Sequence, residues 1–395
     1  MASERQAVIV GAARTPIGKF LGTLSPLSAP RLGAVAIREA VRRAGIDPAR
    51  IDEVIMGNVV SAGLGQAPAR QAAIGGGIPD SVSAVTVNKV CGSGLMAVML
   101  AAQAIRAGDG ELYVAGGMES MSNGPYLQPE ARTGYRMGDG RVIDAVVHDG
   151  LWCPFENQHM GISAEWIAER YKLERAELDE YAVQSHRKAV AAIQAGCFRS
   201  EIVPVDVRQR KGSQLLEQDE LPRADTGIES LARLSPAFKP GGMITAGNSS
   251  GLSDGAAAVV VMEESAARDR GLQPLARVLG YASAAIQPLQ VFACPPLAIR
   301  QMLGKLGLTL ADFDLIEINE AFAAQTVANG KELGWDWSKV NVNGGAIALG
   351  HPIGASGARI LTTLIYALRD RGLKRGLASL CLGGGGAVAM AVEVV

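Results

Sequence analysis

The amino-acid sequence predicts a layered α/β fold with a mainly parallel sheet and two similar halves. Three observations support this prediction. Short apolar runs alternate with amphipathic helical stretches near both ends of the chain, as in βαβ units. A long stretch rich in Gly, Pro and charge interrupts this alternation. Two strand–helix–strand units also share the same landmarks, which indicates an internal duplication.

In the N-terminal part, continuous apolar runs predict strands covered on both faces, and helical periodicity predicts the segments between them. Strands are expected at residues 7–10, 51–56, 85–87 and 112–115. Helices are expected at residues 32–45, 69–75 and 95–107. Gly45 is the expected stop of the first helix, because glycine accepts the left-handed conformation common there.

The segment from residue 118 to about residue 239 departs from this pattern. Residues 121–141 are rich in Gly, Pro and charge and are too long for an ordinary connection inside a compact domain. They are therefore expected to reach a neighbouring subunit or to cover a site. Helices are expected at 162–171 and 176–195, and residues 207–235 are expected to be irregular.

From residue 245 the α/β alternation resumes. Residues 247–262 predict a loop, a short helix and a strand. Further strands are expected at residues 276–282, 315–318, 340–343 and 377–381. Helices are expected at residues 297–306 and from the Gly-rich loop after Asn343 to Gly372.

Two of these regions are similar to each other. VTVN, Ser93-Gly94, a helix and LYVAGG match VNVN, Ser356-Gly357, a helix and SLCLGGG. Two ordinary βαβ units could share such features, but the recurrence of both landmarks favours duplicated halves. In a duplicated fold the equivalent strand–helix junctions meet, so Cys91 is expected to face the His351 and Cys381 loops.

The amino-acid composition excludes some classes of binding partner. The 395-residue chain is 48% hydrophobic, 19% charged and 5% aromatic, with a formal net charge of −1. This composition is typical of a well-packed globular protein. The near-zero charge and few aromatic residues argue against nucleic acid and membrane surfaces as partners.

The chain contains five cysteines, an odd number, without C-x-x-C spacing. This argues against a disulfide framework and a zinc site, so no metal is expected. We also expect no signal peptide, no membrane-spanning helix and no C-terminal targeting tripeptide. A cytoplasmic location is therefore expected.

Cys91 lies between a predicted strand and a predicted helix, directly before Gly92, Ser93 and Gly94. The glycines permit a tight turn, and Ser93 is expected to be the helix N-cap. At such a helix N-terminus a cysteine pKa can fall from about 8.5 into the range of roughly 3.5–7.5. A buried, inert thiol is the alternative for an isolated cysteine, but two further stretches favour a nucleophile.

The first stretch contains His351, in the Gly-rich loop LGHPIGASG, and the second contains Cys381, followed by Leu382 and four glycines. Beside a nucleophilic cysteine, a histidine acts as a general base, although a loop histidine alone is more often a surface residue. Consecutive glycines expose backbone N–H groups that suit an oxyanion. A nucleotide phosphate loop is disfavoured, because no GK[ST] sequence occurs. Two thiols and an imidazole therefore indicate acyl transfer through a thioester.

Five motifs carry a resemblance to a known family: NKVCGSGL, GGMESMSN, NEAFAAQ, NVNGGAIALGHPIGASGAR and CLGGGGAVAM. In this order they resemble the thiolase family over essentially the whole chain, and its short-chain biosynthetic members most closely. The resemblance implies a duplicated five-layered αβαβα fold with an inserted loop domain. It implies an N-terminal half of residues 1–117 with 248–271, a loop domain of residues 118–247 and a C-terminal half of residues 272–395.

The implied activity is a ping-pong Claisen condensation of two acetyl-CoA to acetoacetyl-CoA and CoA, or the reverse thiolysis. Coenzyme A thioesters are then substrates, and no cofactor is expected. Residues 127–142 are similar to the arm that joins dimers into homotetramers in biosynthetic relatives.

By resemblance, Cys91 carries the acyl group and His351 activates it while pointing at the thioester oxygen. Asn319 holds a water that completes this first oxyanion hole. Cys381 deprotonates the second acetyl-CoA. The backbone N–H groups of Cys91 and Gly383 form the second oxyanion hole.

Coenzyme A is expected to contact His159, Arg223 and Ser250. The pantetheine tunnel is expected to be lined by Leu151, Met160, Ala246 and Phe322. Without the resemblance, a helix-start histidine, a solvated loop arginine and a capping serine are the simpler interpretations.

Several positions depart from the family pattern. Gly386 and Ala387 stand where the family has a larger residue and then glycine, and Leu221 stands where histidine is common. Residues 291–297 replace a Gly-containing stretch near the acyl pocket, and Cys294 within them is expected to be structural. A ketoacyl-synthase-type condensing enzyme and a non-catalytic acyl-CoA-binding relative are the alternative functions.

Overall fold

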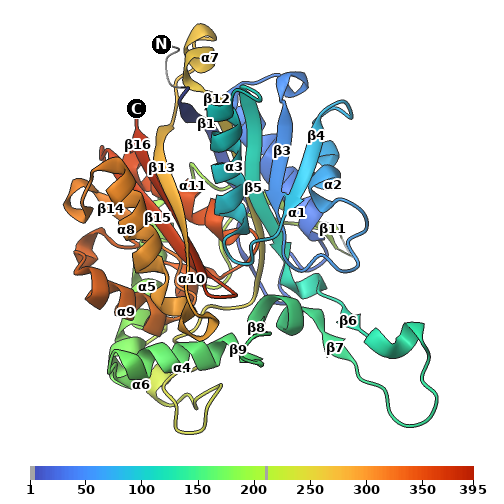
Figure 1. Ribbon diagram of the computed structural model, residues 1–395, viewed down its shortest axis with the longest axis vertical. Helices are drawn as coiled ribbons and strands as arrows, with labels where there is room; N and C mark the ends of the chain where they lie inside the picture. The colour runs from blue at the N-terminus through green and yellow to red at the C-terminus, as the bar shows by residue number, and fades with distance from the viewer. Residues whose placement is uncertain (1–4, 210–211) are drawn as a thin grey trace.

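Strands from both ends of the chain form one mixed sheet in the computed structural model, which describes residues 5–209 and 212–395 (Figure 1). The order is β14-β15-β16-β13-β1-β12-β5-β3-β4, with β2 beside β12. The N-terminal strands are β1 (Ala7–Arg14), β2 (Gly18–Lys19), β3 (Glu53–Gly57), β4 (Ser83–Val87), β5 (Leu112–Ser120) and β12 (Ser253–Glu263). The C-terminal strands are β13 (Ala276–Ala285), β14 (Leu315–Ile318), β15 (Arg375–Leu382) and β16 (Gly386–Val394).

The two half-sheets have the same topology. In the first, β3 runs parallel to β4 and β5, and β5, β12 and β1 follow as antiparallel neighbours. In the second, β14 runs parallel to β15, and its residue Ile316 forms a single parallel bridge with Val340. Strands β15, β16 and β13 follow as antiparallel neighbours. Residue pairs Val8–Arg277 and Ile9–Ala276 connect the halves. The expected duplication is confirmed.

The expectation of a mainly parallel sheet is wrong, because antiparallel pairs outnumber parallel pairs among the described strands. Strand–helix alternation predicts parallel neighbours. However, β12 and β16 each return beside the preceding parallel unit and are antiparallel to both of their neighbours.

The helices divide the half-sheets into layers. Helices α3 (Ser93–Ala107) and α11 (Ser356–Asp370) pack between the half-sheets in a core formed by both. Helices α1 (Ala29–Ala44) and α2 (Pro68–Gly75) cover the outer face of the N-terminal half. Helix α8 (Pro295–Leu306) covers the outer face of the C-terminal half. The five layers are therefore α, β, α, β and α.

The central helices approach closely at a glycine on each. A Cβ atom on Gly94 would lie 2.8 Å from the backbone nitrogen of Ala358, and one on Gly357 would collide with the backbone nitrogen of Leu95. Only glycine permits this approach of two backbones.

Residues 90–107 are apolar and long enough to span a membrane by composition. In this structure α3 packs within the core between the half-sheets.

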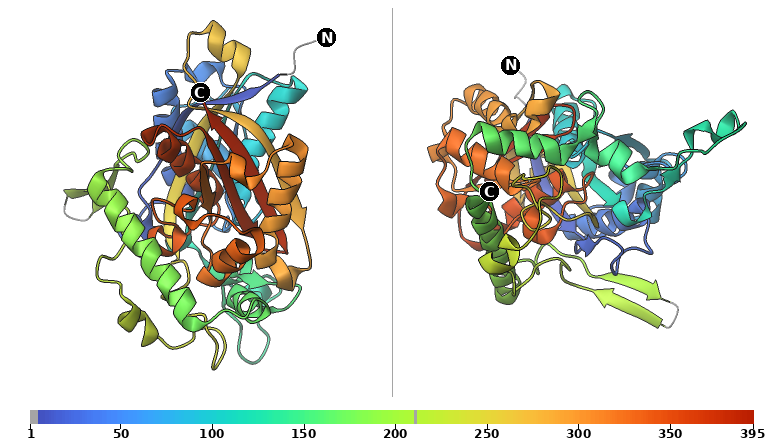
Figure 2. Two further views of the ribbon diagram at one scale, coloured as in Figure 1. Left: turned by 90° about the vertical axis from the view of Figure 1, so that its left-hand side faces the viewer. Right: turned by 90° about the horizontal axis from the view of Figure 1, so that it is seen from below.

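The inserted segment folds over one end of the sheet. Its elements are β6 (Tyr126–Leu127), β7 (Ile143–Asp144), η4 (Val146–Leu151), β8 (Trp152–Cys153), β9 (Gln158–His159), α4 (Met160–Arg170), α5 (Arg175–Ala195), β10 (Val205–Gln209), β11 (Gly212–Leu216) and α6 (Ile228–Ala232). The arm around β6 and β7 and the β10–β11 hairpin project from the body (Figure 2). The other short elements are α7 (Glu264–Asp269), η5 (Pro288–Ala293), α9 (Ala323–Leu333) and α10 (Ala346–Leu349), and the remaining 3₁₀ turns are η1 (Pro48–Arg50), η2 (Met121–Asn123), η3 (Pro129–Arg132), η6 (Leu310–Asp312) and η7 (Trp337–Lys339).

Three expected elements are wrong. Residues 340–343 do not form a strand; instead, the Asn341 side chain hydrogen-bonds both the N–H and the carbonyl of Ile318 at 2.9 Å. The short helix expected within 247–262 is absent, since β12 occupies that apolar stretch. Residues 207–235 contain a hairpin and a short helix, and the part of that prediction at 210–211 lies outside the described residues.

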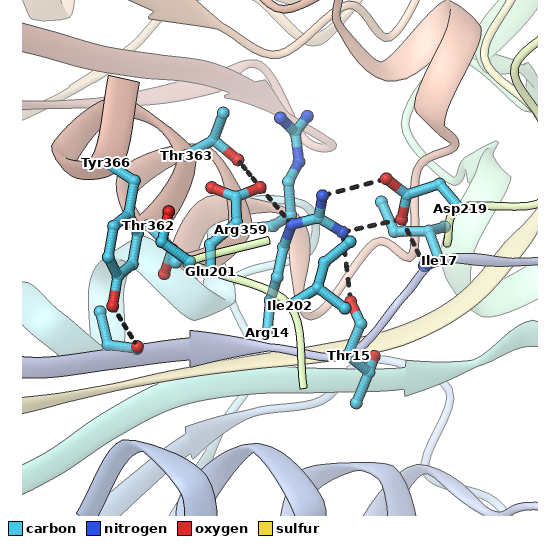
Figure 3. Close-up of polar contacts among 12 residues, drawn as sticks. Arg14, Thr15, Ile17, Glu201, Ile202, Asp219, Arg359, Thr362, Thr363 and Tyr366 are labelled. Atoms are coloured by element: carbon cyan, nitrogen blue, oxygen red, sulfur yellow. Dashed lines mark hydrogen bonds and ion pairs between the residues drawn. The ribbon is translucent and has the colours of Figure 1, made fainter. Parts of the chain in front are cut away.

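A buried ion cluster attaches the inserted segment to β1 (Figure 3). The Arg14 guanidinium donates to Glu201 at 2.6 Å and to the two carboxylate oxygens of Asp219 at 2.7 and 3.0 Å. Asp219 also accepts from the Ile17 backbone N–H at 2.7 Å. All three charged side chains are buried, so each depends on the others for compensation of its lost hydration.

We predict that Arg14→Met destabilises the fold by about 3–5 kcal/mol, because it leaves two buried carboxylates without their cation. Urea unfolding followed by circular dichroism measures this loss. Arg42→Met is the control, because Arg42 is exposed in its pair with Glu39, and it should leave the midpoint nearly unchanged. An Arg14→Met midpoint equal to that of the control would contradict the prediction.

Candidate active site

One cavity of about 370 Å³ collects most of the residues that the sequence singled out. It lies where the two strand–helix junctions meet the inserted segment. The predicted residues in its lining are Cys91, Leu151, His159, Met160, Ala246, Ser250, Phe322, His351, Cys381 and Gly383. Both thiols and the imidazole of the predicted chemistry therefore lie in one pocket, as the duplication implied.

Cys91 lies in a sharp turn between β4 and α3. The preceding residue, Val90, has φ +48°, which is unfavourable for a β-branched side chain. Two side chains stabilise this conformation: Asn88 Oδ1 accepts from the Val90 N–H at 3.0 Å, and Ser93 Oγ donates to the Val90 carbonyl at 2.6 Å. The hydroxyl of Ser93 also accepts from the Lys89 N–H at 2.8 Å. The strained turn directs the residue after it into the cavity.

Two expectations about this turn are wrong. Gly92, not Ser93, is the N-cap of α3, because the Ser93 hydroxyl bonds the preceding turn rather than the helix. Burial also raises the pKa of the Cys91 thiol to about 12, although the backbone N–H groups of Gly383 and of Cys91 itself act to lower it. Desolvation of the thiolate therefore outweighs the helix N-terminus, and the resting sulfur is a neutral thiol.

His351 lies in the loop between α10 and α11. Its backbone N–H contacts the Gly251 carbonyl and Ser253 Oγ, both at 3.2 Å. The preceding Gly350 has φ +101°, and a Cβ atom there would collide with the Ser253 side chain. Glycine is therefore required for the chain to bring His351 against the N-terminal half.

Hydrogen bonds assign the imidazole tautomer. Ser356 Oγ donates to the Pro352 carbonyl at 2.9 Å, so it accepts from His351 Nδ1–H at 2.6 Å. His351 Nε2 is then the unprotonated nitrogen, and Asn319 Nδ2 lies 3.4 Å from it. Burial, followed by repulsion from Arg359, lowers the pKa of His351 to about 3. The ring is a neutral base with its lone pair on Nε2.

Cys381 is the buried penultimate residue of β15 and pairs with Ala387 of β16. Gly383, Gly384 and Gly385 form the turn, with φ of +83° at Gly384 and +86° at Gly385. Gly386 and Ala387, which differ from the family pattern, therefore lie in β16 and not in the turn. Burial, followed by repulsion from Cys91 and Cys294, raises the pKa of Cys381 well above its usual value.

The inserted segment supplies one wall of the cavity. His159 is the N-cap of α4, since its Nδ1 accepts from the Gly161 N–H at 3.0 Å, and its ring stacks on Phe238 at 4.7 Å. Leu151 and Met160 lie beside it in the lining. The simpler interpretation of His159 as a helix-start histidine and its position in the cavity both hold.

Two further segments complete this wall. Ser250 does not cap a helix; its hydroxyl donates to the Ala321 carbonyl at 3.0 Å. Phe322 packs edge-to-face against Phe238 and Phe292, with ring centroids 6.0 and 5.3 Å apart. Ala246 lines the same wall.

Two predicted residues lie outside the cavity. Asn319 is buried behind His351 and contacts its ring. Arg223 lines a neighbouring hollow of about 380 Å³ that shares Ala246, Ser249 and Gly251 with the cavity. Leu221 lines that hollow too and packs in an apolar cluster, which accounts for leucine where histidine is common.

The unusual stretch at 291–297 lies partly in the wall of the cavity and partly in the hydrophobic core. Val291 and Phe292 line the cavity, whereas Cys294 is buried in the cluster that covers the C-terminal half-sheet. Among the described residues, no group of three or more His, Cys, Asp or Glu side chains is arranged to hold a metal ion.

Sequence reasoning missed several contributors to this site. Ser356 was noted as a landmark of the duplication, but its bond to His351 was not foreseen. The signal was present, because a serine five residues after a loop histidine can reach the ring when a helix begins between them. The missed apolar lining includes Met121, Phe238, Leu252 and Ile353.

We predict that alkylation of Cys91 by iodoacetamide rises about tenfold per pH unit from pH 7 to pH 10. The thiolate fraction increases by this factor below a pKa near 12. Peptide mapping by mass spectrometry measures the rate at Cys91, and alkylation of the half-buried Cys197 after unfolding provides an internal reference. A plateau below pH 8 would show that the thiol is already ionised and would contradict the prediction.

The family models agree with the fold and the cavity. Residues 7–265 match the model described as Thiolase, N-terminal domain. Residues 272–394 match the model described as Thiolase, C-terminal domain. Together the two matches span almost the whole chain.

Individual proteins are similar over their full length. The chain is 56% identical over 390 residues to an Escherichia coli protein named acetyl-CoA acetyltransferase, with 98% of this chain and 99% of that protein covered. It is 54% identical over 387 residues to a protein of the same name from Pseudomonas aeruginosa, with 98% of each covered. The crystal structure of the Bacillus anthracis acetyl-CoA acetyltransferase matches at a TM-score of 0.98 and 44% identity, covering both chains completely. This chain belongs to the thiolase family.

Proposed function

We propose that this protein is an acetyl-CoA C-acetyltransferase that condenses two acetyl-CoA to acetoacetyl-CoA and CoA and catalyses the reverse thiolysis. The observation that carries the proposal is the convergence of Cys91, His351 and Cys381 in one cavity. The full-length relatives named acetyl-CoA acetyltransferase support the same activity. The reaction is ping-pong, with an acyl-cysteine intermediate.

In the first half-reaction, Cys91 is the nucleophile. His351 Nε2 takes the Cys91 proton as the sulfur attacks the acetyl carbonyl. The leaving CoA thiolate takes the proton of Cys381, which leaves an imidazolium, a Cys381 thiolate and an acetyl group on Cys91. Asn319 and His351 stabilise the thioester oxyanion, Asn319 through a bound water.

In the second half-reaction, the Cys381 thiolate takes a proton from the methyl carbon of a second acetyl-CoA. The raised pKa of Cys381 makes its thiolate a stronger base for this weak carbon acid. The enolate attacks the acetyl group, and the Cys91 and Gly383 N–H groups stabilise the oxyanion. Cys91 leaves as a thiolate and recovers its proton from His351, which restores the resting enzyme.

Coenzyme A extends from the cavity towards the neighbouring hollow in this proposal. Leu151, Met160, Ala246 and Phe322 contact the pantetheine, and His159 and Ser250 lie along it. Arg223 has the charge to pair with phosphate, and its hollow adjoins the cavity at Ala246.

The remaining proposals concern the substrates, the cellular location and the domain division. The substrates are acetyl-CoA, acetoacetyl-CoA and CoA, with no cofactor, and the location is cytoplasmic. The chain divides into an N-terminal half of residues 1–117 with 248–271, a loop domain of residues 118–247 and a C-terminal half of residues 272–395. β12 supports this division, because it follows the loop domain in sequence and pairs with β1 and β5.

Purified protein should consume acetoacetyl-CoA only when CoA is present, with loss of the enolate absorbance and formation of acetyl-CoA. After incubation with acetyl-CoA, intact-mass spectrometry should show one added acetyl group on the wild type and none on Cys91→Ser. Cys381→Ser should still be acetylated at Cys91 but should condense at least 10²-fold more slowly, because it lacks the base.

Three outcomes would contradict parts of this proposal. An absence of CoA-dependent thiolysis would exclude the activity. An acetyl group found on Cys381 would reverse the two cysteine roles. Full condensation by Cys381→Ser would remove that residue from the mechanism. Cys153→Ser is the matched control, since that buried cysteine lies outside the cavity lining.

We also propose a homotetramer joined through residues 127–142. The arm and the residue before it expose large side chains that a solvated loop would not favour: Tyr126, Tyr135, Met137 and Val142 are 68%, 43%, 99% and 57% exposed. A second copy of the chain would cover them.

Multi-angle light scattering should give four times the chain mass of 41.1 kDa. Met137→Asp should shift the population towards dimers, because it places a charge in the arm contact, whereas Met96→Leu in α3 should not. A monomeric wild type at micromolar concentration would refute the tetramer.

A further inference from the structure

The duplication relates residues of the active site to residues of a second junction in the N-terminal half. Asn58 directly follows β3, and Asn319 directly follows the equivalent strand β14. The residues before them, Gly57 and Ile318, pair with Gly117 of β5 and Ser379 of β15. Gly117 and Ser379 are therefore equivalent positions in the two halves.

Two residues further along these strands are Glu119 and Cys381, so Glu119 is the counterpart of the proposed base. The same correspondence applies to the helices. Ser93 and Ser356 each begin a central helix, and the residues two positions before them are Cys91 and Gly354. The pair Glu119–Gly354 is therefore the counterpart of the pair Cys381–Cys91.

Glu119 is fully buried and its carboxylate is surrounded by donors. Oε1 accepts from Asn58 Nδ2 at 2.8 Å and from the Val60 N–H at 3.2 Å. Oε2 accepts from the Val59 N–H at 3.1 Å and from the Gly354 N–H at 3.0 Å. Four donors and no acceptor match an ionised carboxylate, because a protonated one would direct its own hydrogen at a donor.

One of these bonds crosses from the N-terminal half to the loop that contains His351. Gly354 lies three residues after His351, and its backbone is packed directly on β5. A Cβ atom on Gly117 would collide with the Gly354 carbonyl, and one on Gly354 would lie 2.8 Å from Glu119 Oε2. The loop is thus held against β5 by close packing and by one charged hydrogen bond.

We propose that Glu119 is a positioning residue for catalysis: its ionised carboxylate, at the pseudo-twofold counterpart of Cys381, holds the His351 loop in register with Cys91. One junction of the duplicated fold supplies a thiol that acts on substrate, and the other supplies a fixed anion that supports the opposite loop. This inference rests on the proposed role of His351 as the base.

The test compares Glu119→Gln with the wild type at pH 8.5. Burial raises the pKa of Glu119 to about 7, so this pH keeps the carboxylate ionised. Glutamine retains the shape but places an amide N–H₂ against donors, which releases the Gly354 N–H. Because a shift of about 1 Å at a catalytic group can cost about 10²-fold in rate, we expect kcat for thiolysis to fall 10- to 100-fold. We expect KM for CoA to stay within about threefold.

The rate of Cys91 acetylation, followed by rapid-quench mass spectrometry, should fall by the same factor as kcat. Glu119→Asp keeps the charge but is shorter, so it should recover part of the loss. Glu263→Gln is the matched control, because Glu263 is also buried and accepts from the Ala266 N–H at 2.8 Å, at the far start of α7. It should unfold at a lower temperature than the wild type but keep its kcat.

The inference is overturned if Glu119→Gln retains kcat within twofold, or if its loss of activity equals its loss of folded protein. If Glu119→Gln does not fold, Glu119→Asp carries the test, and an unchanged acetylation rate in that variant also overturns the inference. An inactive wild type, or an active His351→Ala, would instead refute the proposed function on which the inference rests.

Discussion

The contact between α3 and α11 is the constraint on which the active site depends. The two helices touch backbone to backbone at Gly94 and Gly357, where side chains cannot fit. Each helix begins one residue before its glycine, so this contact brings the two helix starts together. The turn with Cys91 precedes one start and the loop with His351 precedes the other. This contact in the centre of the molecule thus fixes the distance between the proposed nucleophile, Cys91, and the proposed base, His351.

Burial sets the chemistry of the groups gathered there. The pKa of Cys91 is raised to about 12 and that of His351 is lowered to about 3, in both cases chiefly because the charged forms lose water. The resting pair is therefore neutral, and in the proposed mechanism charge separates only when a thioester is attacked. The N–H groups of the Cys91 turn and of Gly383 are proposed to face the developing charge. A dry pocket with preorganised donors stabilises that charge more than water would.

Much of the fold could be predicted from the sequence because its signals are local. Apolar runs and helical periodicity located most strands and helices, and the repeated Asn and Ser-Gly landmarks revealed the duplication. Strand direction could not be predicted, since β12 pairs with β1 and β5, which are far away in sequence, and since β16, which turns back on β15, was not expected as a strand. The strand expected at 340–343 failed because the Asn341 side chain replaces backbone pairing, which apolar periodicity does not encode.

The candidate site likewise has features that local sequence reveals and features that depend on distant residues. The cysteines, the histidine and the glycine turns could be found by residue type and spacing. The raised pKa of Cys91 could not, because it depends on burial by residues from several segments. Glu119 was within a motif already quoted, GGMES, but its role depends on Gly354, more than two hundred positions away.

The place where the inserted segment leaves the sheet has a consequence for synthesis. The chain departs at the end of β5 and returns at the start of β12, and Ser120 pairs directly with Asp254. The first half-sheet therefore stays incomplete on the ribosome until the whole excursion has been translated, since β12 fills the gap between β1 and β5. Conversely, the two ends of the excursion are neighbours, so evolution can lengthen, shorten or exchange it while the sheet keeps its strand order.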